Sequence, residues 1–254
     1  MKNKNLKLKL NANQLTIGTW VTISSPKIIE ILANYNFDWI CIDIEHNFFN
    51  NESITNLIRT IQSFNIAALV RVDDNEPVII KKCLDSGADG LIIPMVNTPE
   101  EAKNAVSYSY YANTGNRGVG LSRAQNYGLS FSRYKDWLEE NLVIIAQIEH
   151  YKGIENLEEI VDVKGIDAVF IGPNDLSSSL GFPGELDHPE MVKQLKTFRE
   201  VCKKKKVPFG EHLIYPKLED LRKLIDDGLK FIVYGVDFNF LIRGISDNYD
   251  QIIQ

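Results

Sequence analysis

The chain contains 254 residues, of which 44% are hydrophobic and 24% are charged; these are ordinary proportions for a globular protein that buries a large core. Its formal net charge of -6 at pH 7 leaves no excess of cations to neutralise phosphates, which argues against a nucleic-acid partner. The longest apolar runs are far shorter than the ~20 residues of a membrane-spanning helix, so no membrane association is expected.

The cysteines and the N-terminal segment indicate the compartment. Cys41, Cys83 and Cys202 are far apart in the sequence and lack the paired spacing of a zinc or redox motif. Residues 1–10 alternate lysine, asparagine and leucine without the apolar stretch of a secretion signal. We therefore expect a reduced, cytoplasmic protein. The basic run at residues 203–206 is typical of a solvated helix end, with attraction to a polyanion as the alternative.

Apolar runs of strand length alternate with segments of helical periodicity from residue 15 onward. The predicted strands are residues 15–21, 38–43, 66–72, 88–95, 142–149, 167–172, 207–214 and 231–236. The predicted helices are residues 25–35, 51–64, 77–86, 98–108, 135–140, 154–161, 189–205, 217–227 and 238–253. Ser25 followed by Pro26 is typical of a helix start, and Gly87 is typical of a helix end.

Eight strands that alternate with helices predict a (β/α)8 barrel. We expect one such domain over residues 1–254, with residues 1–13 as a short N-terminal extension. A doubly wound open sheet is the alternative, but no glycine-rich dinucleotide fingerprint follows an early strand. The alternation is interrupted at residues 110–132, and a loop of this length is usually functional or disordered. Arg117 and Arg123, interleaved with tyrosine, favour a functional loop.

Polar residues gather where the predicted strands end, which is where barrel enzymes carry their chemistry. These residues are Asp43, Glu45, His46, Arg71, Gln147, Glu149 and Asp175. Glu149 and Asp175 end two successive strands and can hold one divalent cation, and such a hard oxygen site suits Mg²⁺ or Mn²⁺. A 2-oxo acid that chelates this cation would be activated as an enolate. Arg71 would stabilise the oxyanion and His46 would move a proton.

Each candidate also has a simpler structural interpretation. Glu149 and Asp175 could pair with a lysine or arginine of a loop, and Asp175 could cap the helix that follows it. Arg71 could only neutralise Asp43 or Glu45.

Three further residues have a structural alternative of the same kind. His46 could be a surface or capping residue, and Gln147 could bond a neighbouring strand. Asp85 could be a polar residue at a helix C-terminus. The strand-end motifs contain no lysine, which argues against a Schiff-base aldolase.

Five ordered motifs resemble those of the HpcH/HpaI aldolases, which are metal-dependent pyruvate aldolases of class II. The motifs are Asp43-Ile44-Glu45-His46, Val70-Arg71-Val72, Gly115-Asn116-Arg117-Gly118-Val119-Gly120, Gln147-Ile148-Glu149 and Gly172-Pro173-Asn174-Asp175-Leu176. The resemblance extends over residues 16–236. It implies a barrel of the phosphoenolpyruvate/pyruvate type that reversibly cleaves a 4-hydroxy-2-oxo acid to pyruvate and an aldehyde. It also implies a homo-oligomer, a hexamer or trimer of dimers, whose last helix packs on a neighbouring subunit.

The resemblance assigns a role to each matching residue. His46 is implied as the general base, Arg71 as the transition-state stabiliser, and Asp85 as the acid that raises the basicity of the histidine. The implied pyruvate contacts are Gln147, Asn174 and Asp175. The implied ligands of a divalent cation are Glu149 and Asp175, with Mg²⁺ or Mn²⁺ expected and Co²⁺ or Zn²⁺ as further possibilities.

Two segments depart from the better-known members of the family and leave the aldehyde open. They are residues 120–128 and residues 210–213, where His212 could face the active site or have a structural role. A lyase of the citrate-lyase or oxaloacetate-cleaving type is an alternative function on the same barrel. A non-catalytic barrel is another, but it predicts losses at the metal and base positions, and those positions are intact.

Overall fold

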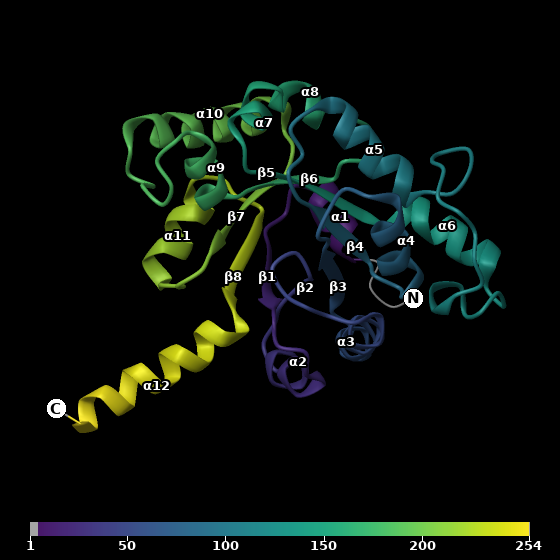
Figure 1. Ribbon diagram of the computed structural model, residues 1–254, viewed down its shortest axis with the longest axis horizontal. Helices are drawn as coiled ribbons and strands as arrows, with labels where there is room; N and C mark the ends of the chain where they lie inside the picture. Colours follow the sequence, from purple (N-terminus) through teal and green to yellow (C-terminus); the bar gives the residue numbers. More distant parts are fainter. Residues whose placement is uncertain (1–4, 254) are drawn as a thin grey trace.

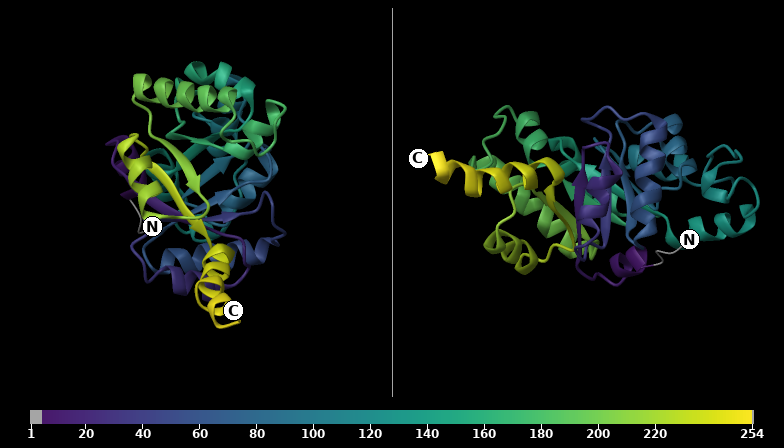
Figure 2. Two further views of the ribbon diagram at one scale, coloured as in Figure 1. Left: turned by 90° about the vertical axis from the view of Figure 1, so that its left-hand side faces the viewer. Right: turned by 90° about the horizontal axis from the view of Figure 1, so that it is seen from below.

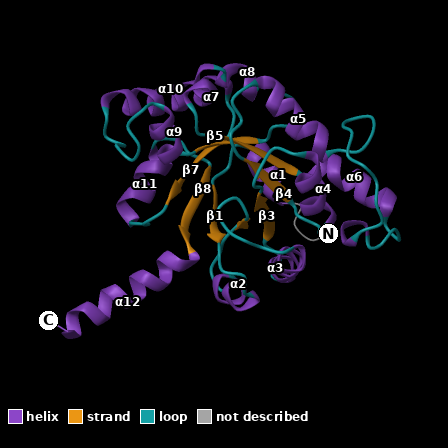
Figure 3. Ribbon diagram, viewed as in Figure 1, coloured by secondary structure: helices purple, strands orange, loops and turns teal. Residues whose placement is uncertain are grey.

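The computed structural model describes residues 5–253 and forms a closed parallel barrel within that range (Figure 1). Each strand pairs with the next, and β8 returns to pair with β1. The helices surround the barrel (Figure 3). The strands are β1 (Thr16–Val21), β2 (Trp39–Asp43), β3 (Ala67–Arg71), β4 (Gly90–Ile93), β5 (Val143–Ile148), β6 (Ala168–Ile171), β7 (Phe209–Leu213) and β8 (Phe231–Val236). The predicted (β/α)8 fold is confirmed, and the closed barrel excludes an open sheet.

The helices follow the predicted order, but α1, α9 and η1 were not predicted and two predicted helices differ in extent. They are α1 (Asn5–Asn11), α2 (Pro26–Leu32), α3 (Asn51–Ser63), α4 (Pro77–Asp85), α5 (Pro99–Ser109), α6 (Phe131–Asn141), α7 (Tyr151–Glu155), α8 (Leu157–Val161), α9 (Pro173–Ser179), α10 (Pro189–Lys205), α11 (Leu218–Asp226) and α12 (Asp237–Ile253), with a short 3-10 helix η1 (Arg123–Gln125). Helix α6 begins at Phe131, earlier than the predicted start at residue 135. Tyr134, which precedes the predicted start, already lies on the buried face of the helix together with Trp137. The predicted helix at 154–161 is two helices, α7 and α8, which meet at Asn156; the side-chain amide of Asn156 donates to the Asn97 carbonyl.

Large side chains fill the interior of the barrel. The rings of Trp39 and Phe231 stack with their centroids 4.2 Å apart, and both are fully buried. The Trp39 ring passes so close to Gly18 that a Cβ there would lie 2.1 Å from it, so only glycine fits. Helix α1 adds Leu6 and Leu10 to this inner cluster, so the predicted N-terminal extension contributes to the core.

Helix α12 projects away from the barrel, as two further views show (Figure 2). Several of its large apolar side chains are exposed: Phe238, Leu241, Ile242, Ile245 and Tyr249. An apolar helix face of this extent is normally covered by another protein surface. Within residues 5–253, no helix combines the length and apolar character that crossing a bilayer requires.

Candidate active site

Arg71, the last residue of β3, lies beside Asp43, the last residue of β2. Its Nε and Nη2 donate to the two carboxylate oxygens of Asp43 at 2.8 and 2.9 Å, and its Nη1 lies 2.7 Å from Glu45 Oε2. The Trp20 ring covers the guanidinium, with Cζ 4.1 Å from the ring centroid. Arg71 thus pairs with both Asp43 and Glu45, the two acids that the simpler structural interpretation named as its partners. These contacts also hold a permanent cation at a fixed position in the mouth of the barrel, the end at which the C-termini of the strands meet.

The neighbouring charges change the pKa values of this group. Burial acts to lower the pKa of Arg71, but its hydrogen bonds to Asp43 and the charges of Asp43 and Glu45 raise it above the ordinary value. Burial raises the pKa of Glu45 to about 7, against the attraction of Arg71, and the charges of Glu149, Asp43 and Asp175 raise it further. The mouth of the barrel thus gathers more carboxylates than cations.

Gln147 and Glu149 point to the same side of β5, as strand alternation predicts. Glu149 is 2% exposed. One of its oxygens accepts from the backbone N–H of Met95 at 2.7 Å, and the other accepts from the side-chain amide of Gln147. The amide oxygen of Gln147 is buried, with no hydrogen-bond partner among the described residues. Burial raises the pKa of Glu149, and the charge of Asp175 adds to this effect.

Asp175 lies in the first turn of α9, at an exposed position. The N-cap of that helix is Gly172, so Asp175 is not the capping residue that the structural alternative proposed. Gly172 also makes room for the neighbouring acid, because a Cβ there would lie 2.8 Å from Glu149 Oε2. The structure brings Glu149 and Asp175 close enough for each charge to affect the same group, Glu45. Asn174 precedes Asp175 and is exposed beside it.

These residues fit a divalent cation. Several carboxylates surround one arginine. Burial first, and then the charges of neighbouring acids, raise the pKa values of Glu45 and Glu149, and an added positive charge would stabilise the ionised carboxylates. Within residues 5–253, no group of three or more histidine, cysteine or acidic side chains is already arranged as a metal cage. A site with two protein carboxylates instead leaves coordination positions for water and substrate.

The structure separates His46 from Asp85. His46 is exposed on the segment after β2, next to Glu45. Asp85 is the last residue of α4, which runs from the Arg71 end of β3 back to the start of β4, so it lies at the opposite end of the barrel. There its Oδ1 lies 2.6 Å from Nη2 of Arg117. Asp85 thus lies at a helix C-terminus, as its simpler structural interpretation predicted. Its implied role in raising the basicity of His46 stays a prediction.

The segment at residues 110–132 is ordered around Arg117. This arginine is 4% exposed, its guanidinium lies 4.9 Å from the ring centroid of Tyr111, and it bonds the hydroxyl oxygen of Tyr134. Gly115 allows a close approach, since a Cβ there would lie 2.3 Å from the Ser107 carbonyl oxygen. Gly115 therefore serves a packed turn, whereas a Cβ at Gly118 would meet nothing within 4 Å. The functional role predicted for this loop stays a prediction.

His212, near the C-terminal end of β7, is connected to Arg71 through the ring of Trp20. Its Nε2 lies 3.1 Å from the Gly235 carbonyl oxygen, and its ring lies 4.6 Å from that of Trp20. Burial lowers the pKa of His212 to about 4, so the ring is neutral at pH 7. Trp20 therefore contacts both Arg71, which lies over its ring, and His212, whose ring is tilted by 51° against it. Sequence reasoning missed Trp20, because an aromatic residue in a first strand gives no sign of which charge it will cover.

Known proteins match this chain over nearly its full length. A family model described as HpcH/HpaI aldolase/citrate lyase matches residues 16–244. The chain is 36% identical over 237 residues to the hydroxypyruvate/pyruvate aldolase of Sagittula stellata, covering 93% of this chain and 92% of that protein. It is 34% identical over 231 residues to the 5-keto-4-deoxy-D-glucarate aldolase of Klebsiella pneumoniae, covering 91% and 90%. A solved HpcH/HpaI aldolase/citrate lyase family protein from Burkholderia cenocepacia superposes with a TM-score of 0.92 at 28% identity, covering 98% and 99%.

The barrel and these matches together define an enzyme of the carbon–carbon lyase class, of the aldolase type. The chain belongs to the HpcH/HpaI aldolase/citrate lyase family, as its motifs predicted.

Proposed function

We propose that this enzyme reversibly cleaves a 4-hydroxy-2-oxo acid to pyruvate and an aldehyde, with a divalent cation bound at the mouth of the barrel. The observation that carries the proposal is the gathering of Arg71, Glu149 and Asp175 at the end of the barrel where β3, β5 and β6 terminate. Relatives named as a hydroxypyruvate/pyruvate aldolase and a 5-keto-4-deoxy-D-glucarate aldolase support the pyruvate product.

Glu149 and Asp175 are the residues that would hold the cation, with Mg²⁺ or Mn²⁺ preferred by their oxygen ligands. When bound, a divalent cation supplies Lewis-acid activation of the 2-oxo acid. The hydrogen bonds from Gln147 and from the Met95 backbone fix the orientation of the Glu149 carboxylate. Loss of a fixed partner of this kind typically weakens metal affinity about 10–100-fold.

The remaining roles follow from the groups that line the mouth. Arg71 is held by Asp43 and Glu45 and presents a permanent charge where the enolate oxygen forms, which lowers the energy of that charge in a buried setting. His46 lies next to Glu45 on an exposed segment and moves the proton of the C4 hydroxyl. The backbone N–H groups of Asn174 and Asp175 and the side chain of Gln147 orient the pyruvate part of the substrate.

The enzyme acts as a homo-oligomer, a hexamer or trimer of dimers, in which α12 packs on a neighbouring subunit. The exposed apolar residues of α12 support this assembly. Assembly also gives Asp85 a route to its predicted role. Because Asp85 and His46 lie at opposite ends of one barrel, His46 requires Asp85 of the partner subunit.

We assign the enzyme to the cytoplasm. Its three cysteines, Cys41, Cys83 and Cys202, are buried and unpaired. Free thiols of this kind are usual in a reducing compartment.

The test is pyruvate release from a series of 4-hydroxy-2-oxo acids, measured before and after treatment with a chelator. We expect release to stop on chelation and to return with Mn²⁺ or Mg²⁺. Citrate and oxaloacetate are included as competing substrates. Cleavage of these two alone, with every 4-hydroxy-2-oxo acid left intact, would contradict the proposed function.

A further inference from the structure

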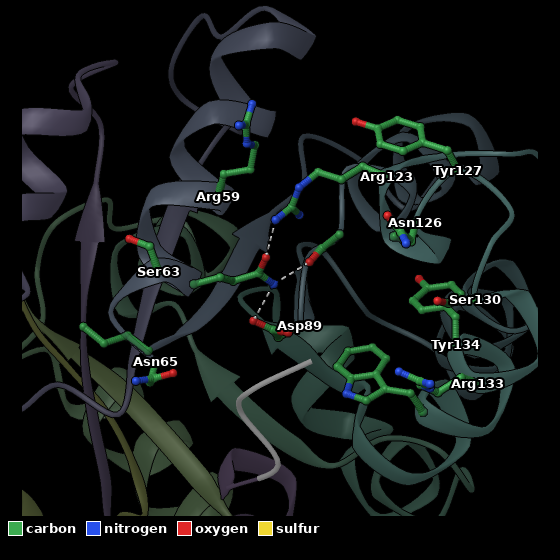
Figure 4. A pocket seen from close by; sticks show the side chains of 15 residues that line it. Arg59, Ser63, Asn65, Asp89, Arg123, Asn126, Tyr127, Ser130, Arg133 and Tyr134 are labelled. Carbon is green, nitrogen blue, oxygen red and sulfur yellow. Dashed lines mark hydrogen bonds between the residues drawn. The ribbon is translucent and has the colours of Figure 1, made fainter.

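A cavity lies at the end of the barrel opposite to the candidate active site. It has a volume of about 610 Å³ and is lined by residues of α3, of η1 and of α6 (Figure 4). Ile66 and Asp89, which precede β3 and β4, form its floor. Arg71 of the candidate active site is the last residue of β3, so the length of that strand, roughly 16 Å for five residues, separates Arg71 from the cavity. A cavity of this volume falls within the usual range for small-molecule sites.

Three arginines line the cavity: Arg59 from α3, Arg123 from η1 and Arg133 from α6. Arg123 extends toward α3, where one terminal nitrogen donates to the side-chain oxygen of Gln62 at 2.8 Å (Figure 4). Its other terminal nitrogen donates to the carbonyl of Ser86, which follows α4, at 2.8 Å. Burial lowers the pKa of Arg123, and the positive charge of Arg59 lowers it further. The two guanidinium groups therefore repel each other across the cavity.

The acid in the lining, Asp89, offsets only part of this charge, because it attracts Arg123 but is one carboxylate beside three arginines. It is 8% exposed, and one of its carboxylate oxygens accepts from the Ala68 backbone N–H at 2.9 Å and from the Gln62 amide at 3.0 Å. Within residues 5–253, neither Arg59 nor Arg133 has an acidic group within ion-pair distance. The cavity thus combines three cations with a single acid that is already hydrogen-bonded to the floor.

We propose that this cavity is a second binding site that takes a small, multiply charged oxyanion, either a phosphate ester or a polycarboxylate. Arginine pairs bidentately with both phosphate and carboxylate oxygens, so both ligand types share the same recognition chemistry. The half-buried Arg123 is pre-positioned by Gln62 and Ser86, whereas the exposed Arg59 and Arg133 can close on the ligand from α3 and α6. The aromatic faces of Tyr134 and Trp137 in the same wall offer apolar contact to the body of the ligand.

The test is a calorimetric titration of chelator-treated full-length protein at low salt, with pyrophosphate in one series and citrate in the other. We expect saturable binding of at least one probe, and the tighter probe identifies the ligand as a phosphate or a carboxylate. Arg59→Gln and Arg133→Gln should each weaken that binding about tenfold, the effect of one lost charge-assisted hydrogen bond. The matched control is Arg222→Gln, an exposed arginine of α11 outside the cavity, which should bind as the unaltered protein does.

Aldol turnover without added anion provides the second measurement. Because Arg59 and Arg133 lie far from the mouth of their own barrel and neither has an assigned role in the reaction, both variants should keep the kcat and KM of the unaltered enzyme. The proposal is overturned if neither probe binds, if both arginine variants bind as tightly as the unaltered protein, or if Arg222→Gln weakens binding to the same extent. Loss of turnover in the cavity variants without added anion would also overturn it, because the site would then not be separate from catalysis.

Discussion

Replacing Arg71 with lysine tests the arginine-centred arrangement of the mouth most fully. The guanidinium makes two hydrogen bonds to Asp43 and a close ion pair with Glu45. A lysine keeps the charge, but its single ammonium group cannot reproduce the two-pronged contact with Asp43. The exposure of the Arg71 and Asp43 side chains is only 5% each, so water cannot replace the lost contacts.

The size of the effect follows from these contacts. Charge-assisted hydrogen bonds contribute about 1.5–3 kcal/mol each, and disrupting a buried ion pair costs about 3–5 kcal/mol, so we expect a loss of about 3 kcal/mol for Arg71→Lys. For a chain of this length that loss lowers Tm by about 6–12 °C. Removing a group that stabilises a developing oxyanion lowers kcat by about 10²–10³-fold.

The assay combines thermal unfolding with pyruvate release at saturating substrate and Mn²⁺. Arg222→Lys, at an exposed position on α11, is the matched control and should leave both Tm and kcat unchanged. If Arg71→Lys kept a Tm within 2 °C of the unaltered protein (well below the roughly 6 °C minimum from the size scaling) and a full kcat, the contacts described for Arg71 would have neither the structural nor the catalytic importance assigned to them.

Three further predictions concern the acids, a glycine and the last helix. The folded-state pKa of Glu45 is raised to about 7 from an ordinary value of 4.5. The unfolded state therefore loses the Glu45 proton first, and the free energy of unfolding of the metal-free protein should fall as pH rises from about 5 through 7. In urea unfolding Glu45→Gln should flatten this pH dependence, and an unchanged slope would contradict the assignment. Gly172→Ala places a Cβ 2.8 Å from Glu149 Oε2 and should weaken Mn²⁺ binding about 10–100-fold, whereas Gly118→Ala, with nothing within 4 Å of its new Cβ, is the control that should bind normally. Ile245→Asp, on the exposed apolar face of α12, should shift the protein to a smaller species in analytical ultracentrifugation while its circular dichroism is kept; an unchanged mass would show that this face is not an interface.

The strand ends could be predicted from sequence because two simple rules act there. A strand covered on both faces must be apolar, so the first charged residue marks its end, as Asp43 and Arg71 do. A closed parallel barrel then brings all such ends to one rim, and this rule alone relates Glu149 to Asp175. Local periodicity and the barrel topology were therefore sufficient to predict that these four residues lie at the same end of the barrel.

Other contacts depend on tertiary packing that no local pattern encodes. Asp85 pairs with Arg117, which is 32 residues away, because the loop before α6 folds back on the end of α4. Trp20 covers Arg71 although the two residues lie on strands that are not neighbours in the barrel. Helix α1 was missed because its alternating lysines and leucines resemble no standard amphipathic pattern, and its helical form is stabilised by the core that Leu10 enters.

The central claim is that Glu149 and Asp175 together bind one divalent cation. The most direct measurement is a calorimetric or electron-paramagnetic-resonance titration of Mn²⁺ into metal-free enzyme, with Glu149→Gln and Asp175→Asn as variants and Glu155→Gln, an exposed acid at the end of α7, as the control. We predict one Mn²⁺ per chain for the unaltered enzyme and the control, and loss of that binding in both variants together with loss of pyruvate release. One bound Mn²⁺ with unchanged affinity in Glu149→Gln and Asp175→Asn would contradict the account.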